Sequence, residues 1–477
     1  MTYDIKFGTD GWRAVIGDGF TFANVRRATQ AACDVIRQTS KSRLIMIGYD
    51  RRFFSDRFAE TAASVASGNG FKVELAAQPV SSPELSFHVK QRKAAMGFMI
   101  TASHNPYKFN GFKMKGPHGG SVDEEVTKAV EGRVDVSDIH TSNDPVKRVE
   151  LGPAYIASLK ARVKWPLPRI KGKVVFDAMH GPGGVLFEQL SSSRDNLIVI
   201  RGEADVLFGG VNPEPIDVNL KALVNKVLET KASIGVAVDG DVDRIGLVDD
   251  KGRYLPPHTV MPLILLHLVE GRKMKGKVVQ TVSMGYLPER IARHFKLPFE
   301  QTPVGFKYIA KVMGKEKVLL GGEESGGYGV GLWSPERDGL LCALLILEMV
   351  AMRKKPLSAI VDELYQRFGV SNFKRVDFPL ESPIDKGPWT EKVTALFGPV
   401  VAGANVKSVL TQDGVRLTLE DDSWLLLRPS GTEPLLRTYA EGTSPQIVEA
   451  LLAEAQKIAL LKEKKPAPEG KKAKRKK

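Results

Sequence analysis

Short apolar runs of strand length alternate with longer amphipathic segments over most of the chain. The apolar runs lie at residues 44–47, 72–76, 96–100, 174–177, 197–200, 234–238, 278–281 and 318–320. The segments 56–67 and 84–91 have apolar residues at helical spacing, and 340–352 predicts a long buried helix. Because strands that alternate with helices are typical of α/β proteins, and the rhythm restarts twice, we predict three similar mixed-sheet α/β domains.

The C-terminal part of the chain has a different pattern. Strands predicted at 406–410, 415–419 and 424–427 follow one another closely, and an amphipathic helix is predicted over 447–461. This pattern is typical of a smaller α+β domain. With a polar linker near residues 140–145, the predicted division is 1–150, 151–256, 257–370, 371–461 and a disordered basic tail at 462–477.

Composition places the chain among ordinary soluble proteins. It has 477 residues, of which 43% are hydrophobic and 26% charged. The N-terminus has no apolar segment typical of a signal peptide, and the most apolar run, 340–352, is too short to span a bilayer and contains Glu348. Cys33 and Cys342 lack metal-binding spacing. We therefore expect a cytoplasmic enzyme with reduced thiols and no membrane contact.

The net charge of +14 is unevenly distributed. Residues 462–477 contain nine Lys or Arg and two Glu, so this tail carries half of the net charge. We expect a flexible, solvated tail, with weak salt-sensitive contact to a polyanion as the alternative. No aromatic residue lies among these lysines, so no specific binding of nucleic acid is predicted.

A candidate reactive serine follows the apolar run 96–100. Ser103 stands in the segment Thr-Ala-Ser-His-Asn-Pro, residues 101–106, and Asn-Pro cannot continue a strand. The hydroxyl of Ser103 is therefore predicted on a loop at the C-terminal end of a strand, where α/β proteins expose reactive groups.

Three carboxylates follow the apolar run 234–238 at alternate positions. Asp239, Asp241 and Asp243 can converge on one hard cation, and Mg²⁺ prefers such oxygen ligands. A calcium-binding EF-hand loop is excluded because Arg244 occupies the position of its glycine. A turn with solvated aspartates is the alternative.

Two turns that contain glycine offer ligand-binding groups. The turn 321–327 presents Glu323 and Ser325, and a carboxylate beside a hydroxyl suits the hydroxyls of a sugar, although an ordinary loop fits this turn equally well. A second turn combines arginine, hydroxyls and glycine-freed N–H groups, which favours a phosphate site. Its residues are Arg428, Ser430, Gly431 and Thr432, with Arg437 close enough to assist.

These four motifs, in this order, resemble the α-D-phosphohexomutase family, which contains phosphoglucomutases, phosphomannomutases and phosphoglucosamine mutases. The resemblance extends to about residue 461 and omits the tail. Further matching segments are FGTDGWR at 7–13, NGFK at 110–113, DAMHG at 177–181 and VGFK at 304–307.

The resemblance implies a phosphoserine mechanism. Phospho-Ser103 would pass its phosphoryl group to a hexose phosphate, and the bound hexose 1,6-bisphosphate would turn over and return its other phosphate. The three aspartates would hold one Mg²⁺ per active site, with Ser103 contributing a phosphoryl oxygen. Carboxylates and phosphate together carry a charge of about −5, so cations are needed, and the candidates are Arg13, Lys113 and Arg244.

The resemblance also suggests roles for the remaining residues. We expect Lys113 to be the general acid/base, with a pKa lowered by nearby cations and the metal. His104 would orient the loop or contact phosphate, because adjacent side chains on an extended loop usually diverge. Lys307, Glu323 and Ser325 would contact the sugar, and the second turn would hold the phosphate that does not react. Closure of the last domain would exclude water.

Substrate choice depends on the turn 321–327. Glu324 and Gly327 resemble phosphoglucomutases or bifunctional members more than phosphoglucosamine mutases, which usually have Gln and His there. We expect interconversion of glucose 1-phosphate and glucose 6-phosphate, with phosphomannomutase or bifunctional activity as the alternative and phosphoglucosamine mutase less favoured. A serine hydrolase lacks support because no Gly-x-Ser-x-Gly surrounds Ser103, and the intact serine and aspartates argue against a non-catalytic binding protein. Monomer and homodimer both remain open.

Overall fold

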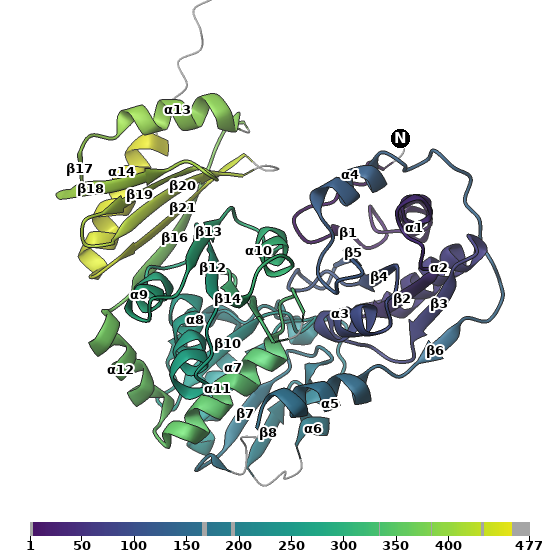
Figure 1. Ribbon diagram of the computed structural model, residues 1–477, viewed down its shortest axis with the longest axis horizontal. Coiled ribbons are helices and arrows are strands. Elements are labelled where there is room, and N and C mark those ends of the chain that lie inside the picture. The colour runs from purple at the N-terminus through teal and green to yellow at the C-terminus, as the bar shows by residue number, and fades with distance from the viewer. Residues whose placement is uncertain are drawn as a thin grey trace, which may run out of the picture. The chain divides into compact units, whose positions relative to one another are not determined.

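The computed structural model of the chain describes residues 3–164, 169–191, 196–332, 334–382, 384–430 and 434–459. The chain forms two compact units, Met1–Val370 and Ser371–Lys477. The first unit contains three sheets with their helices, and the second contains one sheet (Figure 1). The predicted tail at 462–477 lies outside the described residues.

The first sheet is mixed, with the strand order β1-β5-β4-β2-β3-β6. Its strands are β1 (Trp12–Val15), β2 (Leu44–Tyr49), β3 (Lys72–Ala76), β4 (Met96–Ile100), β5 (Phe109–Lys115) and β6 (Lys147–Val149). Its helices are α1 (Phe22–Thr39), α2 (Ser55–Gly68), α3 (Ser82–Gln91) and α4 (Glu124–Glu131). Strands β2 and β4 are adjacent and parallel, with Tyr49 paired to Ile100. The loops that follow these two strands therefore lie side by side at one edge of the sheet.

The second sheet has the order β11-β10-β9-β7-β8. Its strands are β7 (Val174–Asp177), β8 (Leu197–Ile200), β9 (Ile234–Val238), β10 (Ile245–Asp249) and β11 (Tyr254–Leu255). The helices of this part are α5 (Gly152–Arg162), α6 (Gly183–Leu190), η2 (Phe208–Gly210), η3 (Asp217–Asn219) and α7 (Lys221–Thr230). Strands β9 and β10 pair antiparallel, so the aspartate triplet lies in the connection of a hairpin.

The third sheet has the order β13-β12-β14-β15. Its strands are β12 (Lys277–Thr281), β13 (Phe299–Thr302), β14 (Val318–Gly322) and β15 (Tyr328–Val330). Its helices are α8 (Pro257–Leu266), η4 (His267–Gly271), α9 (Leu287–His294), α10 (Phe306–Met313), α11 (Gly339–Arg353) and α12 (Leu357–Phe368). Helix α11 is buried from Gly339 to Ala351, which confirms the buried helix predicted over 340–352.

The second unit has one antiparallel sheet in the order β16-β21-β20-β19-β18-β17. Its strands are β16 (Asn372–Pro379), β17 (Val400–Val401), β18 (Ala404–Leu410), β19 (Val415–Leu419), β20 (Trp424–Pro429) and β21 (Leu435–Gly442), and its helices are α13 (Lys386–Leu396) and α14 (Pro445–Ala459). Val448 and Leu451 of α14 pack with Leu417 and Leu425 of the sheet in one apolar core. The predicted fold class, three mixed-sheet α/β domains followed by an α+β domain, is confirmed.

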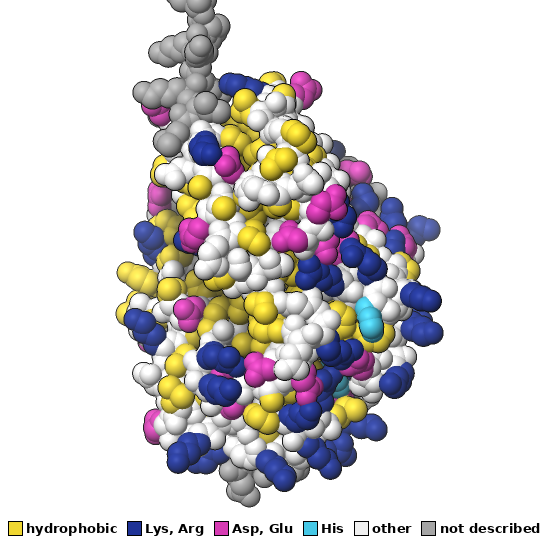
Figure 2. Space-filling view, turned by 90° about the vertical axis from the view of Figure 1, so that its left-hand side faces the viewer, with side chains coloured by type: hydrophobic (Ala, Val, Ile, Leu, Met, Phe, Trp, Pro, Cys, Tyr) yellow, Lys and Arg dark blue, Asp and Glu magenta, His cyan; other side chains and the backbone are white. Residues whose placement is uncertain are grey.

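The surface mixes charged and apolar side chains. Figure 2 shows Lys and Arg side chains interspersed with acidic and hydrophobic ones on the face in view. Over the described ranges, every helix is too short or too polar to cross a membrane. Cys33 and Cys342 are both buried and unpaired with each other.

Candidate active site

Ser103 and the aspartate triplet meet at the edge between the first two sheets. The Ser103 hydroxyl donates a hydrogen bond of 2.7 Å to Asp239 Oδ2. Ser103 follows β4, Asp239 follows β9, and both are fully buried. The backbone of Ser103 has φ +51°, a left-handed conformation that is unusual for a residue other than glycine. Such a residue persists only where surrounding contacts hold it, and it is typical of functional sites.

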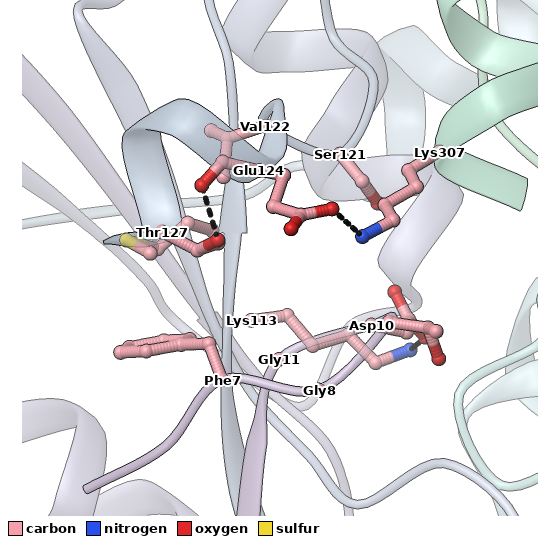
Figure 3. Close-up of a pocket in the computed structure, with 12 residues that line it drawn as sticks. Phe7, Gly8, Asp10, Gly11, Lys113, Ser121, Val122, Glu124, Thr127 and Lys307 are labelled. Carbon is pink, nitrogen blue, oxygen red and sulfur yellow. Dashed lines mark hydrogen bonds and ion pairs between the residues drawn. The ribbon is translucent and has the colours of Figure 1, made fainter. Parts of the chain in front are cut away.

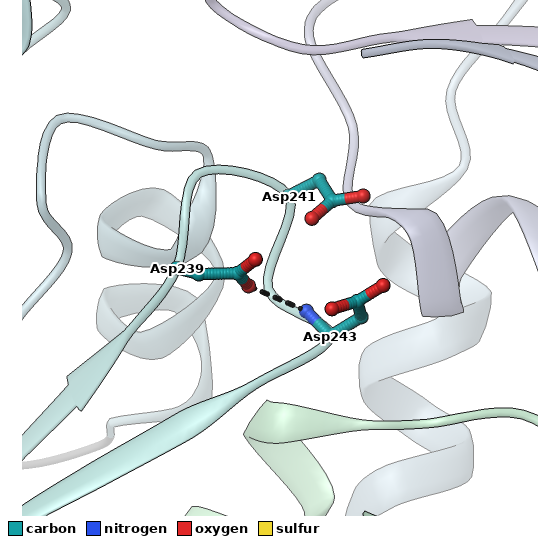
Figure 4. A group of neighbouring side chains, drawn as sticks. All are labelled: Asp239, Asp241 and Asp243. Atoms are coloured by element: carbon teal, nitrogen blue, oxygen red, sulfur yellow. Dashed lines mark hydrogen bonds between the residues drawn. The ribbon is translucent and has the colours of Figure 1, made fainter. Parts of the chain in front are cut away.

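The three aspartates can hold a divalent cation. Their carboxylate oxygens lie within 4.8 Å of one another, and all three residues are buried (Figure 4). Asp241 Oδ1 and Asp243 Oδ1 are buried and accept no hydrogen bond from any residue that the structure describes. Burial, and then the charges of the two neighbouring aspartates, raises the pKa of Asp239 well above its usual value. Converging carboxylates with unsatisfied oxygens fit a hard ion such as Mg²⁺.

Lys113 on β5 lies within the same cluster. Its Nζ is 2.7 Å from Asp241 Oδ2, 3.1 Å from Asp243 Oδ2 and 2.7 Å from Asp10 Oδ2. Burial alone would lower the pKa of Lys113, but these three carboxylates raise it above its usual value. The expectation of a lowered pKa is therefore wrong for this arrangement, because the nearest charges are acidic. Lys113 is a buried cation that partly neutralises the triplet.

His104 turns toward Ser103. Its Nδ1 lies 3.2 Å from Ser103 Oγ, and its Nε2 lies 3.9 Å from Glu214. The expected divergence of the two side chains is therefore wrong, because the left-handed backbone of Ser103 breaks the alternation of an extended strand. Burial, and then the nearby cations, Arg244 first among them, lowers the pKa of His104 well below its usual value, so the ring is neutral.

The two predicted arginines border the cluster from different elements. Arg13 of β1 donates a hydrogen bond of 2.6 Å to Asn105 in the serine loop. Arg244, directly after the triplet, lies 3.9 Å from Asp243 and 3.4 Å from Glu214. The structure thus brings both arginines to the edge of the cluster that contains Ser103.

Arg337 and Asp10 are two further residues of this cluster, and neither was predicted. Arg337 is buried just before α11, and its guanidinium lies 2.7 Å from both Asp10 and Asp243 and 3.5 Å from Glu323. It therefore joins the N-terminal segment, the turn that carries the aspartate triplet and the turn predicted to bind sugar. The sequence feature that could have indicated Arg337 is the charged run at 336–338, immediately before the most apolar helix. Charged residues buried there require partners of opposite charge.

The turn after β14 places Glu323 beside this cluster. Burial raises the pKa of Glu323 to about 7, and Arg337 opposes that shift. Ser325 follows two residues later and is half-buried. Glu324 points elsewhere, because its Oε2 accepts a hydrogen bond of 2.5 Å from Ser283, in the loop after β12.

Lys307 lies at a pocket that borders the cluster. Its Nζ is 2.8 Å from Glu124 of α4 (Figure 3). The same pocket is lined by Asp10, Gly11 and Lys113. Lys307 thus reaches the neighbourhood of the cluster, where its ammonium pairs with a carboxylate of the first sheet's helices.

The predicted phosphate turn lies in the second unit and is described only in part. Arg428 of β20 pairs in register with Arg437 of β21, and Arg428 Nε donates a hydrogen bond of 2.7 Å to Asp413. The Ser430 N–H donates to the carbonyl of Leu435 at 2.8 Å. Gly431 and Thr432 lie outside the described residues.

Sequence models of a known family match along the chain. Models described as phosphoglucomutase/phosphomannomutase α/β/α domains I, II and III match residues 4–139, 153–252 and 256–368. The model of the C-terminal domain of the same proteins matches residues 380–458. This series of domains, with a buried Ser–Asp cluster between the first two, defines a phosphosugar mutase. The chain belongs to the α-D-phosphohexomutase family, which confirms the resemblance seen in its motifs.

Relatives align over nearly the whole chain. A phosphoglucosamine mutase of Xanthobacter autotrophicus is 30% identical over 474 residues, covering 95% of this chain and 99% of the relative. The crystal structure of a Thermus thermophilus protein, described as a phosphomannomutase, superimposes with a TM-score of 0.85 and 35% identity, covering 96% of this chain and 99% of that one. The N-acetylphosphoglucosamine mutase of Aspergillus fumigatus, crystallised with GlcNAc-6P and magnesium, shares the fold at 16% identity and a TM-score of 0.56, covering 95% and 96%.

Proposed function

We propose that this phosphohexomutase interconverts glucose 1-phosphate and glucose 6-phosphate through phospho-Ser103 and a bound glucose 1,6-bisphosphate. The observation that carries the proposal is the 2.7 Å hydrogen bond from the Ser103 hydroxyl to Asp239, at the edge of three converging carboxylates. Phospho-Ser103 would give its phosphoryl group to the free sugar hydroxyl, so one P–O bond breaks at the serine as another forms at the sugar, and the proton of the sugar hydroxyl ends on the released Ser103 oxygen. After the bisphosphate has turned over, its other phosphate would return to Ser103 Oγ.

The charges around Ser103 suit phosphoryl transfer. Asp239, Asp241 and Asp243 would hold Mg²⁺, which when bound neutralises charge on the phosphoryl oxygens. Lys113 and Arg337, both buried, supply two fixed positive charges within hydrogen-bonding distance of the triplet. Arg13 and Arg244 lie at the border of the cluster and would contact the phosphoryl oxygens. Since these groups are already in place, little reorganisation is needed during the transfer.

The turn after β14 supports glucose as the sugar. Glu323 and Ser325 would bind sugar hydroxyls beside the cluster. A side chain at Gly327 would place its Cβ 2.4 Å from Arg337 Cδ, so Arg337 occupies the space that the histidine usual in phosphoglucosamine mutases would need. Glucosamine phosphate is the second candidate, because curated relatives carry the name phosphoglucosamine mutase. Mannose phosphate is the third, because it differs from glucose phosphate only at C2.

Turnover on three substrates tests the proposal. The full chain, supplied with Mg²⁺ and a trace of glucose 1,6-bisphosphate, is assayed with glucose 1-phosphate, mannose 1-phosphate and glucosamine 1-phosphate. We expect the highest kcat/KM on glucose 1-phosphate, and intact-mass spectrometry should show a phosphate increment that Ser103→Ala abolishes together with turnover. Activity on glucosamine phosphate alone would refute the sugar, and full activity of Ser103→Ala would refute the phosphoserine.

A further inference from the structure

Arg52 is a buried arginine that contacts the serine loop and, among the described residues, none of those predicted to bind substrate. It lies in the loop after β2, which is adjacent to the loop after β4 because the two strands pair in parallel. The side chain of Arg52 is 0% exposed. A buried guanidinium is costly unless its donors are satisfied, so its partners show what it does.

The partners of Arg52 are the carbonyl groups of the serine loop. One terminal nitrogen donates hydrogen bonds of 2.6 Å to the carbonyls of Ser103 and Asn105. The other donates bonds of 3.0 Å to the carbonyls of Pro106 and Phe109. One planar group therefore fixes four peptide groups of the loop, starting with that of Ser103 itself.

Asp50 holds the other side of Ser103. Asp50 Oδ2 accepts a hydrogen bond of 2.6 Å from the Thr101 hydroxyl and lies 3.2 Å from Arg52 Nε. Asp50 Oδ1 accepts a bond of 3.0 Å from the backbone N–H of Arg52. The Thr101 hydroxyl in turn accepts a bond of 2.9 Å from the Ser103 N–H. Both peptide groups of Ser103 are thus tied to the loop after β2, the N–H through Thr101 and the carbonyl through Arg52.

These ties explain how Ser103 keeps its unusual backbone. A left-handed conformation costs a non-glycine residue about 1 kcal/mol or more, so contacts must oppose its relaxation. Relaxation would rotate the hydroxyl away from Asp239. The Ser103 carbonyl also closely faces the turn that carries the aspartate triplet, because a Cβ on Gly240 would lie 2.5 Å from this carbonyl. The position of the hydroxyl therefore depends on the carbonyl that Arg52 holds.

Arg52 also contacts the part of the chain that carries the triplet. The ring of Phe208, in η2, lies 4.8 Å from the Arg52 guanidinium carbon, and Phe208 is 1% exposed. A cation over an aromatic face is attracted to it, especially when both are desolvated. The same guanidinium thus binds the serine loop and packs against the second α/β block.

We propose that Arg52 is a positioning residue for phosphoryl transfer, holding Ser103 Oγ in line with the triplet without touching the substrate. The inference rests on the proposed phosphoserine function. A purely structural arginine would have the same neighbours, but its loss would reduce the folded fraction and leave the rate of each folded, phosphorylated molecule unchanged. A positioning residue instead sets that rate, because a misplacement of about 1 Å can cost ~100-fold.

The test compares Arg52→Lys with Arg51→Lys in the full chain. Lysine keeps the charge, but its single ammonium cannot span four carbonyls. With rates normalised to the phosphorylated fraction from intact-mass spectrometry, we expect kcat of Arg52→Lys to fall by about 10- to 100-fold, with KM for glucose 1-phosphate and Mg²⁺ affinity changed less than about threefold. Among the residues that the structure describes, Arg51 donates one hydrogen bond, of 2.7 Å, to the Gly202 carbonyl, so Arg51→Lys should stay within about twofold of wild type.

A second variant, Thr101→Val, tests the proposal if Arg52→Lys does not fold. Thr101→Val removes the hydroxyl between Asp50 and the Ser103 N–H in nearly the same volume, and it should lower kcat with KM unchanged. An unchanged normalised kcat in the folded variant, whichever of the two is measured, overturns the proposal. A wild-type protein without phosphoserine and without mutase activity overturns the proposed function instead, so the two failures are distinct.

Discussion

Replacing Ser82 by alanine should weaken Mg²⁺ binding, in addition to the unfolding free energy that the loss of one buried hydrogen bond costs. The Ser82 hydroxyl donates a hydrogen bond of 2.6 Å to Asp241 Oδ2, and the Ser82 N–H donates one of 2.9 Å to the Asp241 carbonyl. The alanine variant loses the first bond and keeps the second. A carboxylate ligand that loses an orienting partner binds metal more weakly.

The size of the effect follows from the contacts of Asp241. Loss of a group that hydrogen-bonds a metal ligand typically lowers metal affinity by about 10- to 100-fold, which is about 1.4–2.7 kcal/mol. Lys113 Nζ lies 2.7 Å from the same oxygen and remains in the variant, so we expect the lower end of that range. About 1.5 kcal/mol corresponds to a roughly tenfold higher Kd for Mg²⁺.

The neighbouring residue provides a matched control. The Ser81 hydroxyl caps α3 by accepting a bond of 3.2 Å from the Glu84 N–H, and it lies one residue from Ser82. Ser81→Ala should therefore lose about 1 kcal/mol of unfolding free energy while its Kd for Mg²⁺ stays within about twofold.

Isothermal titration with Mg²⁺ and urea unfolding without metal measure the two effects separately. Equal Mg²⁺ affinities in wild type and Ser82→Ala would refute the reasoning. So would a loss of affinity in Ser81→Ala as large as that in Ser82→Ala.

Two further substitutions probe buried carboxylates away from the cluster. Burial would raise the pKa of Glu348, but hydrogen bonds from His267 and Arg272 lower it to about 2. Because the folded pKa lies below the ordinary value, the stabilisation is complete above pH ~5 and is lost as pH falls through about 2. Glu348→Gln should therefore lose at least about 1 kcal/mol of unfolding free energy at pH 7 and clearly less at pH 2.5. An equal loss in urea unfolding at both pH values would contradict this. In the second unit, Trp424 Nε1 donates a bond of 2.6 Å to buried Glu441, so Trp424→Phe should cost about 2 kcal/mol. In Trp424→Phe, amide hydrogen exchange should accelerate in β20 and β21 only. Unchanged exchange in these two strands would contradict the stabilising role of the Trp424–Glu441 hydrogen bond.

Much of the fold was predictable because the strands are apolar and bounded by turns. The predicted runs 72–76 and 96–100 coincide with β3 and β4. Strand β5 was not among the predicted strands, because its sequence contains a glycine and two lysines. Lys113 and Lys115 are both buried there, each paired with carboxylates from distant segments. A buried lysine has no local signal, since its partner lies far away in the sequence.

The cluster was predictable only for residues that lie in compact motifs. Ser103 and the aspartate triplet each stand in a short unusual segment after an apolar run, and the structure brings them together. Arg52 and Ser82 stand in segments without such a pattern, and Arg337 has only the charged run at 336–338 before a buried helix; the partners of all three are distant in sequence. The orientation of His104 depends on the left-handed backbone of Ser103. The residue types in this segment do not predict that backbone conformation.

The cations that neutralise the aspartate triplet are synthesised at different times from the triplet itself. A ribosome releases the 239–243 turn after Lys113 but well before Arg337, which lies 2.7 Å from Asp243 in the finished fold. A nascent chain that ends at residue 256 therefore carries three crowded carboxylates with only part of their neutralising charge. We expect excised versions of the second α/β block to be poor starting points for protein engineering unless the turn is first made less acidic.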